Sequence, residues 1–135
     1  MPEQEQVVDV LIVDDEQVVC DAVRLVLREE GLSVAAAPDG RMALVHPARI
    51  TCRLVLCDLM LPDLPGFEVI RLLREIRSGL PVVVITGYPT SENAMRAVEA
   101  GASDFLPKPF TESELLEVVR RILGQEDRAA GRRER

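Results

Sequence analysis

The sequence has little of what disulfide frameworks and zinc sites require. Its three cysteines, Cys20, Cys52 and Cys57, are odd in number and no two stand at C-x-x-C spacing, and His46 is the only histidine. Neither a disulfide framework nor a zinc site is therefore expected. We expect buried free thiols in a reducing compartment, and a structural role for His46, which stands directly before Pro47.

Long apolar runs and an excess of basic residues are also missing. No stretch approaches the roughly 20 apolar residues that span a bilayer, and the start, Met-Pro-Glu-Gln-Glu-Gln, lacks the regions of a signal peptide. Lys and Arg number 16 against 23 Asp and Glu, a formal net charge of −7. Because nucleic-acid and membrane surfaces need clustered Lys and Arg, we expect a cytoplasmic protein that binds neither.

What the chain does have is four short apolar runs that each end in a polar, reactive residue. Apolar, largely β-branched runs of this length predict strands buried on both faces. Ligands of open α/β sheets bind at the carboxyl ends of such strands. The residues delivered there suit a divalent cation and a phosphoryl group, and they are Asp14, Asp15, Asp58, Thr86 and Lys108.

Strand and helix alternate along the chain. We predict strands near 8–14, 32–36, 53–58, 82–86 and 103–107, and helices over about 16–30, 40–46, 66–77, 91–100 and 112–123. Gly31, Pro47 and Gly101 mark helix ends, and Thr111 with Glu114 predicts a capping box at the last helix. At 135 residues, 47% of them hydrophobic, one domain is expected. The fold class is α/β, a doubly wound parallel sheet with helices on both faces.

The acidic residues raise a question of charge. Asp14 and Asp15 end the first predicted strand and Asp58 ends the third, and these strands can be neighbours in a doubly wound sheet. Carboxylates brought together without a counter-ion raise one another's pKa. A hard cation, Mg²⁺ with Mn²⁺ as an alternative, would resolve the conflict. The competing interpretation is that the acidic residues only cap the first helix.

Lys108 and Thr86 fit a phosphoryl group. A lysine can neutralise charge on phosphoryl oxygens, and a threonine hydroxyl can donate one hydrogen bond to them. Lys108 stands between Pro107 and Pro109, and the Lys108–Pro109 bond is a candidate for a cis peptide. A surface lysine in a proline turn is the alternative.

The sequence resembles the receiver domain of the response regulators of bacterial two-component signalling, through an ordered series of residues: Asp14, Asp15, Asp58, Pro62, Gly66, Thr86, Lys108 and Pro109. The resemblance covers residues 8–124, and it leaves a polar extension at 1–7 and a polar, charged tail or linker at 125–135. It implies the flavodoxin-like five-stranded sheet in the order 2-1-3-4-5.

By this resemblance Asp58 is the phosphoacceptor. Asp14, Asp15, Asp58 and the main-chain carbonyl of Met60 are implied to hold the Mg²⁺ ion. The phosphoryl group is implied to come from a sensor histidine kinase or a phosphotransfer protein. The domain is then a signalling switch that catalyses its own phosphorylation and dephosphorylation, and it is not a turnover enzyme.

The resemblance also implies a switch. Thr86 and Lys108 are implied to contact the phosphoryl group, and Thr86 and Phe105 to change position together. The altered surface would lie over the predicted fourth helix, fifth strand and fifth helix. The downstream partner or output domain stays open, as does a phosphorylation-dependent homodimer.

Four residues flank the implied site: Met60, Gly87, Tyr88 and Pro109. The family often has polar residues at one or both of the positions of Met60 and Tyr88. We expect these bulky side chains to shield an acyl phosphate and lengthen its life. Phe105 stands where the family often has a tyrosine.

Other functions stay open at this point. One is a phosphorylation-independent scaffold, and others are an aspartyl-phosphate phosphohydrolase or a flavodoxin-like cofactor protein. The tail leaves no room for a DNA-binding domain, so either a free-standing regulator or a receiver joined to something longer is expected.

Overall fold

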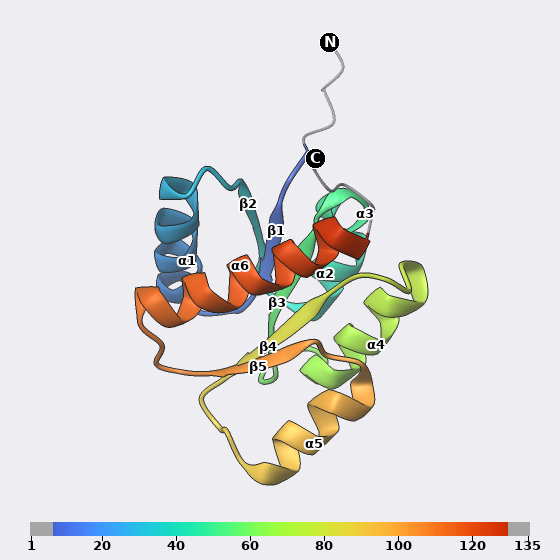
Figure 1. The fold of residues 1–135 in the computed structure, drawn as a ribbon. Helices are drawn as coiled ribbons and strands as arrows, with labels where there is room; N and C mark the ends of the chain where they lie inside the picture. The colour runs from blue at the N-terminus through green and yellow to red at the C-terminus, as the bar shows by residue number, and fades with distance from the viewer. Residues whose placement is uncertain (1–6, 130–135) are drawn as a thin grey trace.

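Five parallel strands form the sheet at the centre of the computed structural model, which describes residues 7–129 (Figure 1). In chain order they are β1 (Val10–Val13), β2 (Val34–Ala37), β3 (Leu54–Asp58), β4 (Val82–Thr86) and β5 (Asp104–Pro107). They lie side by side in the order β2-β1-β3-β4-β5. The predicted fold class and strand order are confirmed.

Within the described part of the chain, six helices cover the two faces of this sheet. They are α1 (Gln17–Glu29), α2 (Gly40–Val45), α3 (Ala48–Thr51), α4 (Gly66–Ile76), α5 (Ser91–Ala100) and α6 (Glu112–Ala129). One core cluster joins α1 and α6 to alternate residues of β1, β3 and β4, and the second joins α2, α3, α4 and α5 to the intervening residues. Because successive strand residues point to opposite faces, each buried strand contributes to both clusters.

Local signals around the last strand and the last two helices agree with the prediction. The Thr111 N–H donates to Glu114 Oε1 at 2.9 Å and the Glu114 N–H donates to Thr111 Oγ1 at 3.0 Å, which completes the capping box at α6. The Lys108–Pro109 peptide bond is cis, as predicted. Gly101 ends α5 with a φ of 95°, a conformation that glycine tolerates.

The structure differs from the prediction in the length of the last helix. We predicted an end near residue 123, but α6 continues to Ala129, so residues 125–129 of the predicted tail are helical. A contact far away in the sequence accompanies this extension, since Arg53 Nη2 lies 2.7 Å from Asp127 Oδ1. Residues 1–6 and 130–135, which hold most of the predicted polar extension and the rest of the tail, lie outside the described residues.

Short helix α3 is a second difference, since no helix was predicted there. Helix α2 ends at Val45, in agreement with the expected effect of Pro47. The chain then turns back into a helix at Ala48, whose N–H donates to His46 Nδ1 at 3.0 Å. His46 therefore has the structural role that the sequence suggested.

Within residues 7–129, no helix combines the length and the apolar character needed to cross a membrane.

The contact at His46 predicts a pH dependence of stability. Burial, followed by the charge of Arg49, lowers the pKa of His46 from 6.5. The unfolded chain then binds the proton more readily, so folding stability falls as the pH drops through about 6.5. We expect the free energy of unfolding of wild type to fall more between about pH 7.5 and pH 5 than that of His46→Asn, whose side-chain oxygen can accept the same hydrogen bond. Urea unfolding followed by circular dichroism measures this, and parallel pH profiles for the two proteins would contradict it.

Candidate functional site

The carboxyl ends of four neighbouring strands bring the predicted polar residues to one edge of the sheet. Asp14 follows β1, Asp58 ends β3, Thr86 ends β4 and Lys108 follows β5. Among the described residues, only Asp14, Asp58 and Thr86 are polar or charged and buried, with exposed fractions of 1%, 4% and 0%. Buried polar groups are costly unless they are paired, so this edge is the chemically distinctive part of the described structure.

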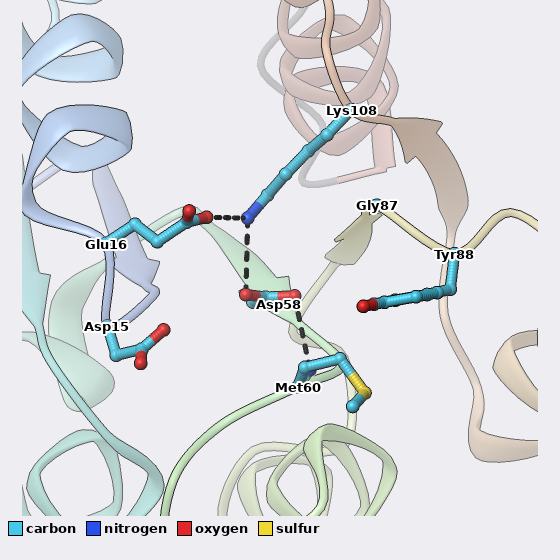
Figure 2. A pocket seen from close by; sticks show the side chains of 7 residues that line it. All are labelled: Asp15, Glu16, Asp58, Met60, Gly87, Tyr88 and Lys108. Carbon is cyan, nitrogen blue, oxygen red and sulfur yellow. Dashed lines mark hydrogen bonds and ion pairs between the residues drawn. The ribbon is translucent and has the colours of Figure 1, made fainter.

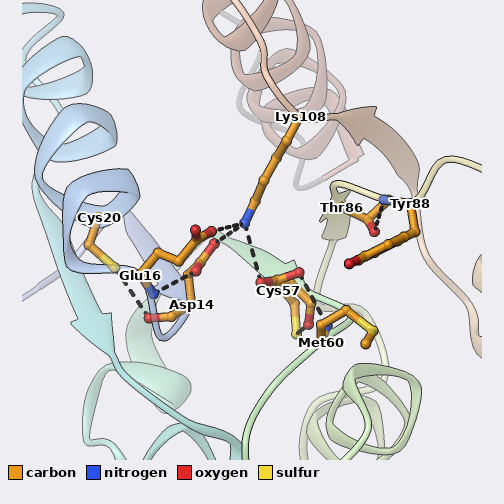
Figure 3. A network of polar contacts seen from close by, with 9 residues as sticks. Asp14, Glu16, Cys20, Cys57, Met60, Thr86, Tyr88 and Lys108 are labelled. Atoms are coloured by element: carbon orange, nitrogen blue, oxygen red, sulfur yellow. Dashed lines mark hydrogen bonds and ion pairs between the residues drawn. The ribbon is translucent and has the colours of Figure 1, made fainter.

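Lys108 is the charge partner of three carboxylates. Its Nζ lies 2.8 Å from Glu16 Oε1 and 2.9 Å from Asp14 Oδ2 (Figure 3), and 3.3 Å from Asp58 Oδ2. The lysine side chain is only 15% exposed, so these ion pairs are partly shielded from solvent. One ammonium group therefore stands against three negative groups.

The pKa values reflect this imbalance. Burial raises the pKa of Asp14, and the charge of Asp58 adds to that effect, while the N–H of Glu16 and the ammonium of Lys108 oppose it. Burial alone would lower the pKa of Lys108, but bonds to Glu16 and Asp14 and the charges of Asp14 and Asp58 outweigh it and raise the pKa. Lys108 therefore stays protonated at neutral pH. A further positive charge nearby would stabilise the ionised form of Asp14.

The Asp58 carboxylate opens onto a cleft of about 500 Å³ (Figure 2). Its Oδ2 faces Lys108, and its Oδ1 accepts a hydrogen bond of 3.2 Å from the main-chain N–H of Met60. The cleft is lined by Asp15, Glu16, Asp58, Met60, Gly87, Tyr88 and Lys108. A small anionic group could therefore approach Asp58 through a polar opening.

The site can hold a hard cation. Carboxylate oxygens of Asp14, Glu16 and Asp58 lie within 4.8 Å of one another. Oxygen ligands of this kind suit Mg²⁺ or Mn²⁺. Asp14 Oδ2 is buried, and its ionic partner is the Lys108 ammonium. The donor set therefore fits the predicted cation.

Glu16 was missed by the prediction, and Asp15 lies differently from what was expected. Asp15 is exposed and lines the cleft, but it is not in the set of three carboxylates. Its role as a cation ligand stays a prediction. The signal for Glu16 was present, because it is the third acid of the consecutive run Asp14-Asp15-Glu16.

The loop after Asp58 is tightly folded against it. The Gly66 N–H donates to the Leu59 carbonyl at 3.0 Å, and Met60 forms a bridge with Pro65. A Cβ at Gly66 would overlap the carbonyl oxygen of Asp58 and the Cα of Leu59. Glycine is therefore required where α4 begins, and its closeness fixes the base of the loop that carries Met60.

The predicted switch residues share one face of the sheet. Thr86 pairs with Pro107 and Val84 pairs with Phe105, so Thr86 and Phe105 both point to the face covered by α4 and α5. Phe105 is half-buried there. Thr86 Oγ1 accepts a hydrogen bond of 2.9 Å from the main-chain N–H of Tyr88. The structure shows this arrangement, and the switching role stays a prediction.

Two of the three cysteines contact the main chain of the polar site: the Cys20 thiol donates to the Asp14 carbonyl at 3.5 Å (Figure 3), and the Cys57 thiol to the Asp58 carbonyl at 3.4 Å. All three are free and buried, as predicted. Burial, reinforced by the charge of Asp14, raises the pKa of Cys20 to about 11. Burial likewise raises the pKa of Cys57, which lies directly before Asp58. These thiols are therefore uncharged at neutral pH and are poor nucleophiles.

Curated proteins similar to the chain are bacterial regulators. The chain is 37% identical over 118 residues to "Probable transcriptional regulatory protein TcrX" of Mycobacterium tuberculosis, which covers 87% of this chain and 50% of that protein. It is 40% identical over 116 residues to "Response regulator MprA" of Mycolicibacterium vanbaalenii, which covers 86% of this chain and 50% of that protein. The chain thus spans about half the length of these relatives.

Solved structures share the fold. A CheY-like response regulator receiver domain protein from Methanospirillum hungatei superposes with a TM-score of 0.83 at 28% identity, covering 92% of this chain and 99% of that one. NtrX from Brucella abortus gives a TM-score of 0.85 at 33% identity, covering 93% of this chain and 29% of that one. The family model described as "Response regulator receiver domain" matches residues 10–120. Since that match spans the whole sheet and every residue of the polar edge, the chain belongs to the response regulator receiver domain family.

Proposed function

We propose that Asp58 takes a phosphoryl group from a phosphohistidine, carried by a sensor histidine kinase or by a phosphotransfer protein. This proposal rests mainly on one observation: the Lys108 Nζ lies 3.3 Å from Asp58 Oδ2, and both residues line a cleft that a small anion can enter. The family to which the chain belongs supports the kind of partner. Receivers act in this way as signalling switches, and their own residues supply much of the transfer chemistry.

The transfer step follows from the charges at the cleft. The Asp58 carboxylate attacks phosphorus in line, so a P–O bond forms as the P–N bond to the donor imidazole breaks and the imidazole leaves with the bonding electrons. Lys108 neutralises charge on the phosphoryl oxygens, because its ammonium is already within ion-pair distance of the acceptor. The product is an acyl phosphate, which water hydrolyses in turn and so resets the switch.

A divalent cation, Mg²⁺ with Mn²⁺ as an alternative, would supply further positive charge beside the transferred oxygens. Asp14 and Asp58 would hold it, with Asp15 and the Met60 carbonyl as the ligands that the resemblance implies. Glu16 lies close enough to Asp14 and Asp58 to join this set. Lys108 would then be free to exchange its carboxylate partners for the phosphoryl oxygens.

The output we propose is a change over α5, β5 and α6. The Thr86 hydroxyl would turn from the Tyr88 N–H toward a phosphoryl group on Asp58, and Phe105, on the same face of the sheet, would fill the space that it leaves. Relatives such as TcrX are named as transcriptional regulators and are about twice as long as this chain. A joined output domain, a separate partner or a second copy of the chain could each receive the signal.

The first test is direct phosphorylation by a small donor. Wild type incubated with acetyl phosphate or phosphoramidate and Mg²⁺ is expected to gain the mass of one phosphoryl group, because Asp58 supplies the nucleophile. Asp58→Asn is expected to gain nothing, and EDTA is expected to suppress the gain in wild type, while Mn²⁺ restores it. Intact-protein mass spectrometry measures this. No gain in wild type would contradict the proposal and favour a scaffold, and an equal gain in Asp58→Asn would place the acceptor elsewhere.

The second test concerns the lifetime of the phosphorylated state. Met60 and Tyr88 border the cleft with exposed fractions of 58% and 61%, and we expect them to limit the access of water to the acyl phosphate. Met60→Asn and Tyr88→Glu should therefore dephosphorylate several-fold faster than wild type once the donor is removed. Ile50→Asn, an exposed apolar position on α3 that does not line the cleft, is the control. Unchanged or slower decay in both site variants would count against the shielding role.

The third test asks whether Phe105 transmits the change. Beryllofluoride with Mg²⁺ mimics the phosphoryl group, and we expect it to alter amide exchange in α5, β5 and the start of α6 of wild type. Phe105→Ala should take up phosphate from a small donor at the wild-type rate but show a much smaller exchange response. A response equal to that of wild type would leave Phe105 an ordinary core aromatic.

A separate measurement addresses the oligomeric state. Light scattering with and without the beryllofluoride mimic would detect a dimer.

A further inference from the structure

The loop that follows Asp58 is hydrogen-bonded to a distant helix through the side chain of Asp63. Its Oδ1 accepts a hydrogen bond of 2.9 Å from the Gly40 N–H, and its Oδ2 accepts one of 2.9 Å from the Arg41 N–H. The Arg41 Nε lies 3.7 Å from the same Oδ2. Both donors belong to the first turn of α2, whereas Asp63 lies in the loop between β3 and α4. The contact therefore joins the neighbourhood of Asp58 to another part of the fold.

The chemistry of this contact is that of a helix cap provided from outside the helix. The first N–H groups of a helix have no partner within it, and they attract negative charge. The side chain of Asp39, the local N-cap of α2, accepts a hydrogen bond of 2.9 Å from the Met42 N–H. Partial burial acts against Asp63, but the N–H groups of Arg41 and Gly40 outweigh it and lower the pKa of that carboxyl. Asp39 and Asp63 thus share the start of α2 between them.

The start of α2 is also closely packed against the loop and α4. A Cβ at Gly40 would lie 2.7 Å from Val69 Cγ2 and 3.1 Å from Leu64 Cδ1, so the start of α2 is already in full contact with α4 and the loop. Leu64 directly follows Asp63 in the sequence. The hydrogen bonds of Asp63 and the contact of its neighbour therefore act at one place.

The loop accordingly has two anchors, with Met60 between them. At its base, the Gly66 N–H donates to the Leu59 carbonyl at 3.0 Å. Beyond Met60, Asp63 is held by α2. Met60 itself is 58% exposed, so its side chain does little to fix the main chain. Its N–H nevertheless lies 3.2 Å from the Asp58 carboxylate, which requires a well-placed backbone.

We propose that Asp63 is a positioning residue of the phosphoacceptor site, which holds the Met60 main chain in register with the Asp58 carboxylate by anchoring the loop to α2. The consequence for cation binding rests on the proposed function above, because it takes the Met60 carbonyl as a ligand. The consequence for loop order in the metal-free protein does not. Without Asp63 the segment around Met60 would keep the contacts at its base and the packing of Leu64 against the start of α2, but it would lose its hydrogen bonds to that helix.

The matched pair of variants is Asp63→Ala and Asp39→Ala. Both remove an aspartate that caps α2, but only Asp63 belongs to the loop that carries Met60. A merely structural role predicts that each variant lowers stability and leaves the site unchanged. The positioning role predicts that only Asp63→Ala changes the site, and that Asp63→Asn, which keeps one acceptor oxygen, lies between it and wild type.

Three measurements separate these cases. In EDTA, Asp63→Ala should exchange the amides of Met60 and its neighbours faster than wild type, while Asp39→Ala should not. Mn²⁺ affinity can be measured by electron paramagnetic resonance, and we expect it to fall about tenfold in Asp63→Ala. This is the lower end of the losses of affinity that follow when a group that orients a metal ligand is removed. The Mg²⁺ concentration for half-maximal phosphorylation by phosphoramidate should rise similarly, with the rate at saturating Mg²⁺ close to that of wild type.

The outcomes are distinct. Wild-type Mn²⁺ affinity and amide exchange in Asp63→Ala would overturn the positioning role, and so would an equal loss in Asp39→Ala. Failure of wild type to bind Mn²⁺ or to accept phosphate would instead contradict the proposed function, and the amide exchange in EDTA would still support or overturn the anchoring of the loop.

Discussion

The balance of charge at the carboxyl edge of the sheet is the constraint on which the site depends. Asp14, Glu16 and Asp58 surround one ammonium group, that of Lys108. A buried carboxylate costs free energy unless it is paired, and one lysine cannot fully compensate three. The edge therefore carries a net negative charge that attracts a cation. In the proposed function, an arriving phosphoryl group would compete with the carboxylates for the same lysine, so binding and transfer would change the same set of ion pairs.

The parallel sheet explains why these charges meet at all. β1 lies between β2 and β3, so the residue that follows β1 and the last residue of β3 are neighbours although 44 positions separate Asp14 from Asp58. β4 and β5 extend the row with Thr86 and Lys108. Because the strands are buried by helices on both faces, the polar residues have one common outlet, the cleft at the ends of the strands.

The sequence was sufficient to predict what depends on local patterns. The apolar runs located the strands to within about two residues, and their polar ends supplied Asp14, Asp58, Thr86 and Lys108. What it could not supply depends on contacts between distant segments. The end of α6 is accompanied by the pairing of Asp127 with Arg53, 74 positions away. The contact of Asp63 with the start of α2 spans 23 positions. Neither pair has a recurring spacing that a pattern search could detect.

Glu16 shows the same limit at short range. Its place directly before α1 was compatible with a helix cap, and its side chain makes no cap hydrogen bond there. It instead reaches Lys108, 92 positions away. The acidic run therefore does more than favour the helix dipole, because two of its three members, Asp14 and Glu16, pair with the lysine that follows β5.

The attachment of the helices indicates where such a site can transmit a change. Parallel pairing and packing on both faces hold β3 and β4 in place, so we do not expect these two strands to move. Helix α5 is held more weakly, since Ala97 is its only buried residue, whereas α4 buries Gly66, Val69, Ile70 and Leu73. Residues 87–90, which include the exposed Gly87 and Tyr88, connect Thr86 to the start of α5. Elements with few buried contacts open at the lowest free-energy cost. A change at Thr86 would therefore reach the surface through α5 before it reached any other helix.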